Sequence, residues 1–206
     1  MKMILVLTLL SLAPFLLVMV TSFTRIIVVL HFVRSALGTQ TSPPNQVLIG
    51  IALFLTLFIM APVMTQINKD CIQPYDKGKL TQEEALNAGL KPIRKFMFEQ
   101  TNRKDIRLFM EIEKQSNDVS IEKEDEIPTL VLIPAFMISE LRIAFIIGFL
   151  IYLPFIVIDM VVASTLMSMG MMMLPPTTIS APFKILLFVM ADGWNLIIGN
   201  LVATFK

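Results

Sequence analysis

Long apolar stretches, interrupted by one charged segment, run through most of this chain. The apolar pattern predicts one helix over Met3–Leu37 and a second over Gln46–Gln66. Each is at least as long as the roughly 20 residues that a helix needs to cross a bilayer. Ile127–Leu174 is too long for a single straight crossing, and Ile179–Phe205 predicts a final helix. The pattern therefore predicts an all-α membrane protein with two long apolar helical hairpins, at residues 1–67 and 127–206.

Two segments with the same spacing predict the reversals of these hairpins. Each contains a glycine, four further residues and a pair of prolines, and each lies between long apolar stretches. A glycine readily ends a helix and two prolines cannot continue one, so we expect a tight turn at each segment. The shared spacing also indicates an internal pseudo-repeat, as in many transporters. The turn residues are Gly38, Pro43 and Pro44 in the first segment and Gly170, Pro175 and Pro176 in the second.

The segment that joins the hairpins, residues 68–126, differs sharply in composition. It contains eleven Lys or Arg and thirteen Asp or Glu, which predicts a water-exposed segment. Thr81 and Glu84 have capping-box spacing and predict the start of a helix, which Gly89 is positioned to end. Apolar residues at helical spacing further on predict amphipathic helices. Both a solvated connector and a dedicated binding surface fit this pattern.

Six charged residues lie inside the apolar helices. An ionised side chain in hydrocarbon must be paired or hydrated, and the signs here balance, with three positive and three negative groups. We expect Glu140 to pair with Lys184, and Arg25 to pair with Asp159 or Asp192. The set could form a proton or ion relay, or ion pairs that lock subunits together. The predicted buried charge network is Arg25, Glu140, Arg142, Asp159, Lys184 and Asp192.

Methionines are concentrated at the second predicted turn. Met171, Met172 and Met173 are consecutive, and Met167 and Met169 come just before them. Thioether side chains are flexible and deform without breaking hydrogen bonds, so a ring of them from several subunits could seal a pore and still yield to a polypeptide. Ordinary packing against lipid or protein explains the same residues without a pore. Both interpretations are open at this point.

Composition excludes several classes of function. The 206 residues are 55% hydrophobic and have a mean hydropathy of +0.75, and the net charge of +1 argues against binding to nucleic acid. Cys71 and His31 are single, so the chain predicts neither an internal disulfide nor a Cys/His metal site. Motifs for nucleophilic, metal-dependent or phosphate-binding catalysis are not found in the sequence, so we predict no enzyme activity and no cofactor.

Ten short motifs follow one another in a recognisable order along the chain. They are Thr21–Ile26, Arg34–Gly38, Pro43–Gln46 and Phe58–Pro62 in the first half, and Ile133–Phe136, Ser139–Leu141, Ile158–Met160, Gly170–Pro176, Pro182–Lys184 and Asp192–Trp194 in the second. In this order they resemble the FliP family of flagellar type III export-gate proteins. The resemblance covers nearly all of the chain outside residues 68–126.

The resemblance implies a pore-forming subunit in the bacterial inner membrane, within the flagellar basal body, through which unfolded flagellar proteins are exported. It implies a ring of identical copies, expected to be a homopentamer inside a larger complex, with FliQ, FliR, FlhB and FlhA as partners and lipid around it. It also implies that Met171, Met172 and Met173 form a gasket in the pore. In such an assembly the apolar segments can stand above the bilayer, shielded by neighbouring subunits.

Orientation and the N-terminus give two further expectations. Arg34 lies near the first turn and residues 68–126 have more acidic than basic groups, which places the first turn in the cytoplasm and the charged segment in the periplasm. Residues 1–20 lack a small-x-small cleavage site and predict part of the fold instead of a signal peptide. Family precursors often have a leader, so a processed form and a member without a leader both remain possible.

Three rival functions stay open at this stage. A virulence-associated branch of the family serves injectisomes and shares most of these motifs. A small ion-coupled transporter would use Glu140, Asp159 and Lys184 as titrating groups. A structural scaffold would need no pore and no methionine gasket.

Overall fold

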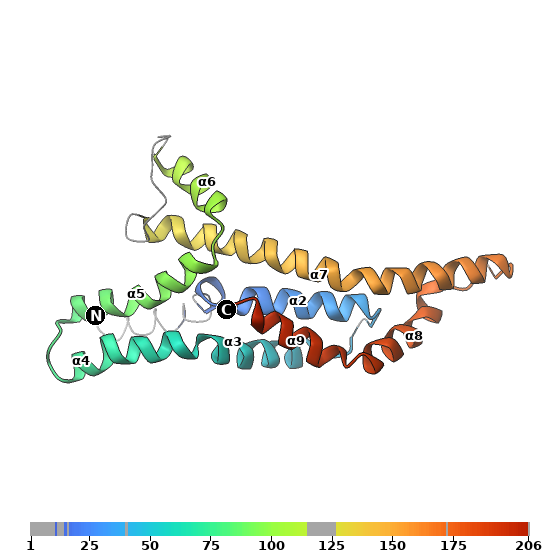
Figure 1. Cartoon of the computed structure of the whole chain (residues 1–206), viewed down its shortest axis with the longest axis horizontal. Coiled ribbons are helices and arrows are strands. Elements are labelled where there is room, and N and C mark those ends of the chain that lie inside the picture. The colour runs from blue at the N-terminus through green and yellow to red at the C-terminus, as the bar shows by residue number, and fades with distance from the viewer. Residues whose placement is uncertain are drawn as a thin grey trace. The chain divides into compact units, whose positions relative to one another are not determined.

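A computed structural model of the chain describes residues 11, 15, 17–39, 41–114, 127–171 and 173–205. Every element within these residues is helical, which confirms the predicted all-α class. The helices are α2 (Phe23–Ala36), α3 (Asn45–Ile67), the π-helix η1 (Asn68–Ile72), α4 (Gln73–Asp76), α5 (Gln82–Gln100), α6 (Arg103–Lys114), α7 (Thr129–Ser168), α8 (Pro176–Met190) and α9 (Gly193–Ala203) (Figure 1).

Two helices in the described part of the chain are long and apolar enough to cross a membrane. One is the continuous run of α3, η1 and α4, which covers 32 residues from Asn45 to Asp76, and the other is α7 with 40 residues. At 1.5 Å per residue, α7 is roughly 60 Å long, about twice the thickness of a hydrocarbon core. The pair α8 and α9, bent by 65° at the break between them, can count as a third crossing.

Contacts divide the chain into two compact units. The first contains Met1–Thr24 and Thr56–Arg142, and the second contains Arg25–Leu55 and Ile143–Lys206. The boundaries at residues 55 and 142 lie inside α3 and α7, so each of these helices contributes to both units. The division into segments 1–67, 68–126 and 127–206 therefore remains a proposal based on composition.

In the first unit, α5 and α6 pack their apolar sides onto the N-terminal part of α7. The rings of Phe96 in α5 and Phe136 in α7 meet edge to face, with centroids 6.1 Å apart. Ile106 and Met110 in α6, four residues apart and therefore on one helix face, are both buried. The amphipathic helices predicted in the charged segment are thus present, and their apolar faces form part of a core.

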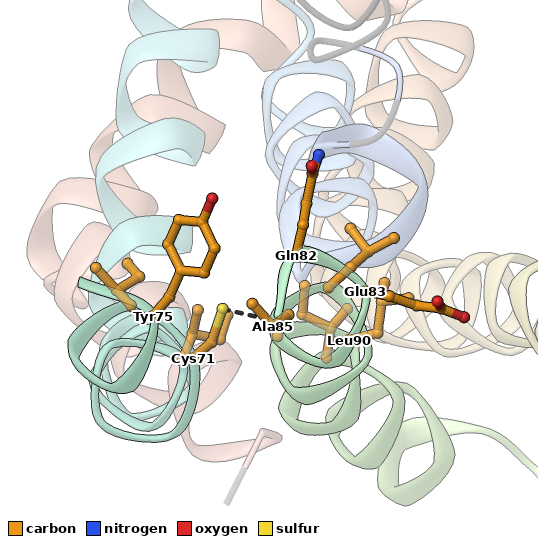
Figure 2. Close-up of a pocket in the computed structure, with 11 residues that line it drawn as sticks. Cys71, Tyr75, Gln82, Glu83, Ala85 and Leu90 are labelled. Atoms are coloured by element: carbon orange, nitrogen blue, oxygen red, sulfur yellow. Dashed lines mark hydrogen bonds between the residues drawn. The ribbon is translucent and has the colours of Figure 1, made fainter. Parts of the chain in front are cut away.

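The hairpin of η1, α4 and α5 in the first unit encloses an open apolar hollow of about 790 Å³. Cys71 of η1 lines it and donates a hydrogen bond from Sγ to the Ala85 carbonyl oxygen at 3.0 Å (Figure 2). A Cβ atom at Gly89 would lie 3.3 Å from the same sulfur, so the close approach of α5 to Cys71 favours glycine there.

In the second unit, aromatic residues of α7, α8 and α9 surround the end of α2. Phe188 lies between Phe155 and Trp194, with ring centroids 6.4 and 5.2 Å away. These rings pack with Val33 and Leu37 in one buried cluster. The end of α2 is therefore held by side chains from three other helices.

The chain departs from the predicted helices at three places. The helix expected over Met3–Leu37 is interrupted at Thr21 and Ser22, where the Thr21 hydroxyl group donates to the Leu17 carbonyl and accepts from the Phe23 amide and so competes with backbone hydrogen bonds. The helix capped by Thr81 and Glu84 is confirmed, but it continues through Gly89 to Gln100.

The third departure is the final helix, expected to be continuous from Ile179 to Phe205. It breaks at Asp192, whose backbone adopts the left-handed conformation with φ of +48°. Gly193 follows, and a Cβ atom there would lie 2.4 Å from the Phe188 ring. The packing of Phe188 therefore requires a glycine at the start of α9.

Candidate functional site

The turn between α7 and α8 is built by a Schellman motif. Gly170 has φ of +74°, the Met171 amide donates to the Leu166 carbonyl at 3.0 Å, and the Gly170 amide donates to the Met167 carbonyl at 3.1 Å. This pair of bonds around a left-handed glycine ends a helix and satisfies its last carbonyl groups. Pro175 and Pro176 then start α8. The turn between α7 and α8 is therefore short, and both of its ends are well defined.

Methionine side chains of this turn point to the outside of the chain. Met169, Met171 and Met173 are 67%, 43% and 98% exposed. Met172 lies outside the described residues. A side chain as apolar and as exposed as Met173 is expected to meet lipid or another protein surface.

A buried ion pair joins α7 to α8 below this turn. Lys184 Nζ lies 2.6 Å from Asp159 Oδ2, and the side chains are 4% and 28% exposed. Ser180, which is fully buried, donates from Oγ to Asp159 Oδ1 at 2.5 Å. Both carboxylate oxygens of Asp159 thus have a donor from α8. These contacts therefore fix the spacing between α7 and α8 at the position of Asp159.

Lys184 also reaches the first reversal of the chain. Its Nζ atom lies 3.9 Å from the position that a Cβ atom would take at Gly38. Gly38 has φ of +73° and follows the C-terminus of α2. A cation near a helix C-terminus is stabilised by the partial negative charge of the last carbonyl groups. Lys184 therefore contacts Asp159 and lies near the end of α2 at the same time.

Polar contacts also shape the first reversal itself. Arg34 of α2 donates from Nη1 to Asn45 Oδ1, at 2.5 Å, and so joins the two ends of the turn. Pro43 and Pro44 precede α3, and the Pro44 carbonyl accepts from the Val47 and Leu48 amides at 3.0 and 3.3 Å at the start of this helix.

A second ion pair lies in the first unit, between α6 and α7. Arg142 Nη2 lies 2.5 Å from Asp105 Oδ1, and the side chains are 45% and 3% exposed. Ser139 donates from Oγ to Asp105 Oδ2 at 2.6 Å and accepts from the backbone N–H of Asn102 at 2.9 Å. The start of α6 is therefore fixed to α7 through one buried carboxylate and one buried hydroxyl group.

Arg25 is buried in the second unit beside the C-terminal residues. Its Nη1 atom donates to Thr204 Oγ1 at 3.0 Å and to the Thr204 carbonyl at 3.2 Å. The guanidinium group lies 3.9 Å from the centre of the Phe205 ring, which is a cation–π contact. The last described residues of the chain are thus tied to the start of α2.

The chain matches known proteins over nearly its whole length. The model of the FliP family matches residues 6–201. Flagellar biosynthetic protein FliP of Bacillus subtilis (strain 168) is 54% identical over 204 residues, which are 99% of this chain and 91% of the relative. The protein of the same name from Pectobacterium carotovorum is 48% identical over 199 residues, or 97% of this chain and 76% of the relative. That of Aquifex aeolicus (strain VF5) is 47% identical over 205 residues, or 100% of this chain and 85% of the relative.

The chain belongs to the FliP family.

Members of the FliP family are named flagellar biosynthetic proteins, and the match covers both reversals and both ion pairs described above. The chain is therefore a protein of flagellar biosynthesis and export. Helices long enough to cross a membrane, together with the family, support a membrane-associated flagellar location. The family indicates no catalytic activity.

The predicted pairing of the buried charges was wrong for Lys184 in this FliP family member. Its carboxylate partner is Asp159 and not Glu140, because α8 runs beside the C-terminal part of α7. Asp159 receives Lys184 and Ser180 in place of Arg25. Asp159 and Lys184 thus pair with each other within the second unit.

Two further charges of the predicted set are Asp192 and Glu140. Asp192 accepts a hydrogen bond from Asn195 Nδ2 at 3.0 Å at the start of α9. Glu140 is fully buried in α7. Asp105 was not among the predicted residues, since it lies in a segment dense with charge. The spacing from Asn102 to Asp105, typical of a helix start, was the available signal.

Proposed function

We propose that this chain is a pore-forming subunit of the flagellar type III protein export gate in the bacterial inner membrane, and that unfolded flagellar proteins pass through the pore. The observation that carries the proposal is the turn between α7 and α8, which exposes Met169, Met171 and Met173. Family membership supports the flagellar system, and the exposed methionines support a surface that other subunits complete.

The chemistry of the turn suits a seal that opens for a polypeptide. Methionine has three rotatable side-chain bonds and a polarisable sulfur, so it packs against surfaces of different shape. A ring of Met171, Met172 and Met173 from several copies would exclude water and ions when closed, because an apolar constriction dewets. An unfolded chain could displace these side chains without breaking hydrogen bonds.

The helices on both sides of the turn are fixed, which a gasket requires. The Schellman motif defines the end of α7, and the Asp159–Lys184 pair holds α8 at a set distance from it. We therefore expect the turn to move by side-chain rotation, with little movement of the helices that support it.

The assembly that completes the pore belongs to the same proposal. It contains copies of this chain, expected to be a homopentamer, with FliQ, FliR, FlhB and FlhA, and the segment 68–126 faces the periplasm. Membrane lipid surrounds or underlies the ring. The exposed apolar side chains of α3 and α7, among them Phe54, Phe58, Phe149 and Val157, supply surface for such contacts.

The ion leak of cells that carry a variant turn tests directly whether the methionines seal the pore. Changing Met171, Met172 and Met173 together to alanine is expected to make cells leak ions while the complex still assembles, as judged on a native gel. Met64→Ala is the matched control, because Met64 is also exposed but lies in α3. Intact assembly with no leak and normal motility would contradict the gasket.

An ion-coupled transporter is the rival that a specific observation favours, because Asp159 and Lys184 form an ion pair inside apolar helices. Asp159→Asn separates the two functions. A locking pair predicts loss of assembly, whereas a titrating pair predicts normal assembly with loss of transport.

A further inference from the structure

The helix break before α2 contains a buried hydroxyl group without a hydrogen-bond partner. Residues 17–20 are helical, Thr21 and Ser22 are not, and α2 begins at Phe23. Ser22 is fully buried, and none of the residues that the structure describes offers a hydrogen-bond partner to its Oγ atom. Burial removes the hydrogen bonds that a hydroxyl group makes with water, so unpaired cases are rare in folded proteins. Ser22 thus gains no hydrogen bond in this conformation.

The two threonines near Ser22, Thr21 and Thr24, both form hydrogen bonds through their hydroxyl groups. Thr21 Oγ1 donates to the Leu17 carbonyl at 2.5 Å and accepts from the Phe23 amide at 3.3 Å. Thr24 Oγ1 donates to the Val18 carbonyl at 2.7 Å and lies 3.9 Å from Met137 Sδ of α7. These contacts stabilise the interrupted helix. The hydroxyl groups on either side of Ser22 therefore hold the break in place.

The Val18 carbonyl is the acceptor for which two residues can compete. In an uninterrupted helix this carbonyl accepts from the amide of residue 22, and a serine at that position can turn its hydroxyl group to the same oxygen. In the structure the donor is Thr24, six residues further along. Thr24 is therefore satisfied when the helix is broken, and Ser22 finds a partner when the helix is continuous.

We propose that Thr21–Thr24 is a two-state hinge, in which Thr24 and Ser22 exchange as donors to the Val18 carbonyl. The broken form is the one described here, and the continuous form aligns residues 17–20 with α2. The segment belongs to the first unit, whose first stretch ends at Thr24. This inference does not depend on the proposed pore.

Spin labels on either side of the break distinguish the two forms. Met19→Cys and Ser35→Cys use exposed positions, and Cys71→Ser removes the native thiol. In a continuous helix these positions, sixteen residues apart, are about 24 Å apart along the axis. Double electron–electron resonance is measured on the assembled complex, with labelled chains diluted into unlabelled ones.

Thr24→Val removes the donor that holds the broken form and keeps the shape of the side chain. The ratio of broken to continuous forms is expected to fall by roughly five- to thirty-fold, which raises the component near 24 Å. Thr24→Ser, the matched control, keeps the hydroxyl group and the original distribution. Equal distributions for the valine and serine variants would overturn the hinge.

The double variant Ser22→Ala/Thr24→Val tests the exchange of donors. Removing Ser22 Oγ takes away the hydrogen bond that favours the continuous helix, so the distribution is expected to return toward the broken form. A double variant identical to Thr24→Val would show that Ser22 has no part in the hinge.

Ser22→Ala alone gives a second measurement that does not depend on the valine variant folding. Because Ser22 Oγ is unpaired in the broken form, the thermal unfolding midpoint should stay unchanged or rise. A lower midpoint would mean that Ser22 is hydrogen-bonded in the native state, and the hinge would be withdrawn.

Discussion

The ion pairs Asp105–Arg142 and Asp159–Lys184 have the same construction but different surroundings. In each, one carboxylate receives a cation on one oxygen and a serine hydroxyl on the other, and one partner belongs to α7. In the first unit the buried member is the carboxylate, and Arg142 remains 45% exposed. In the second unit the buried member is Lys184, and Asp159 is 28% exposed.

In both pairs, substitution of the more exposed partner is the costly one. Removing the exposed partner leaves the buried charge without compensation, whereas removing the buried partner leaves a charge that water can reach. An arginine half in solvent also gains less from its pair than a lysine held in an apolar bundle. The pair near the methionine turn should therefore contribute more to stability than the pair at the start of α6.

Asp159→Asn is expected to have the largest effect, because it leaves the buried Lys184 ammonium group without its carboxylate. We expect a loss of about 3 kcal/mol of unfolding free energy. The double variant Asp159→Asn/Lys184→Met should recover most of this loss. Denaturant unfolding of the purified chain in detergent measures both. A double variant as unstable as the single one would contradict the comparison.

Arg142→Gln should cost less, about 1 to 2 kcal/mol, because Ser139 still donates to the buried Asp105 carboxylate. The same unfolding measurement applies. Lys95→Gln is the control, since Lys95 and Glu99 form an exposed pair at 3.9 Å on one helix, worth about 0.5 kcal/mol or less. If Arg142→Gln cost more than Asp159→Asn, burial would not be the deciding factor.

Salt should affect the stability contributions of the two pairs differently. Raising ionic strength from about 0.1 M to about 1 M shortens the Debye length from about 10 Å to about 3 Å. The effect of Arg142→Gln on stability is then expected to shrink, while that of Asp159→Asn stays nearly constant. Repeating both unfolding measurements at high salt tests this. Equal salt dependence of the two variants would mean that the pairs are equally exposed.

The smallest effect is expected from the fully exposed cap of α5. Hydrogen bonds from the Thr81 amide and hydroxyl group lower the pKa of Glu84 below its usual value. A lowered pKa in the folded state means that the stabilising contribution is present above the usual pKa and is lost as pH falls through the lowered value. The stability difference between the wild-type chain and Glu84→Gln should therefore shrink between about pH 6 and about pH 3. A difference independent of pH would show that the Glu84 charge does not matter.

Local patterns in the sequence predicted the helical class and the Thr81 cap, because both depend on neighbouring residues. Helix ends set by packing were missed. Gly89 lies inside α5, where the absence of a Cβ atom accommodates the nearby Cys71, and no local pattern reports that contact. The break before α9 did have a local signal, since Asp192-Gly193 is a dipeptide typical of turns.

The candidate site was harder to predict, because ion pairs depend on which helices lie side by side. The sequence identified Asp159 and Lys184 as charges that need partners, but their mutual pairing follows from the packing of α7 and α8. Asp105 shows the opposite case: it lies among exposed charges in the sequence and is buried in the fold. Charge density therefore did not predict burial at that position.

The central claim is that the methionine turn lines the path of exported proteins, and site-specific crosslinking to a stalled export substrate tests it most directly. A photoreactive amino acid at position 173, where Met173 is 98% exposed, is compared with one at position 64 in α3. The account predicts crosslinks to the substrate from position 173 and none from position 64. Crosslinks from position 64 alone, or from neither position in an assembled complex with a trapped substrate, would contradict it.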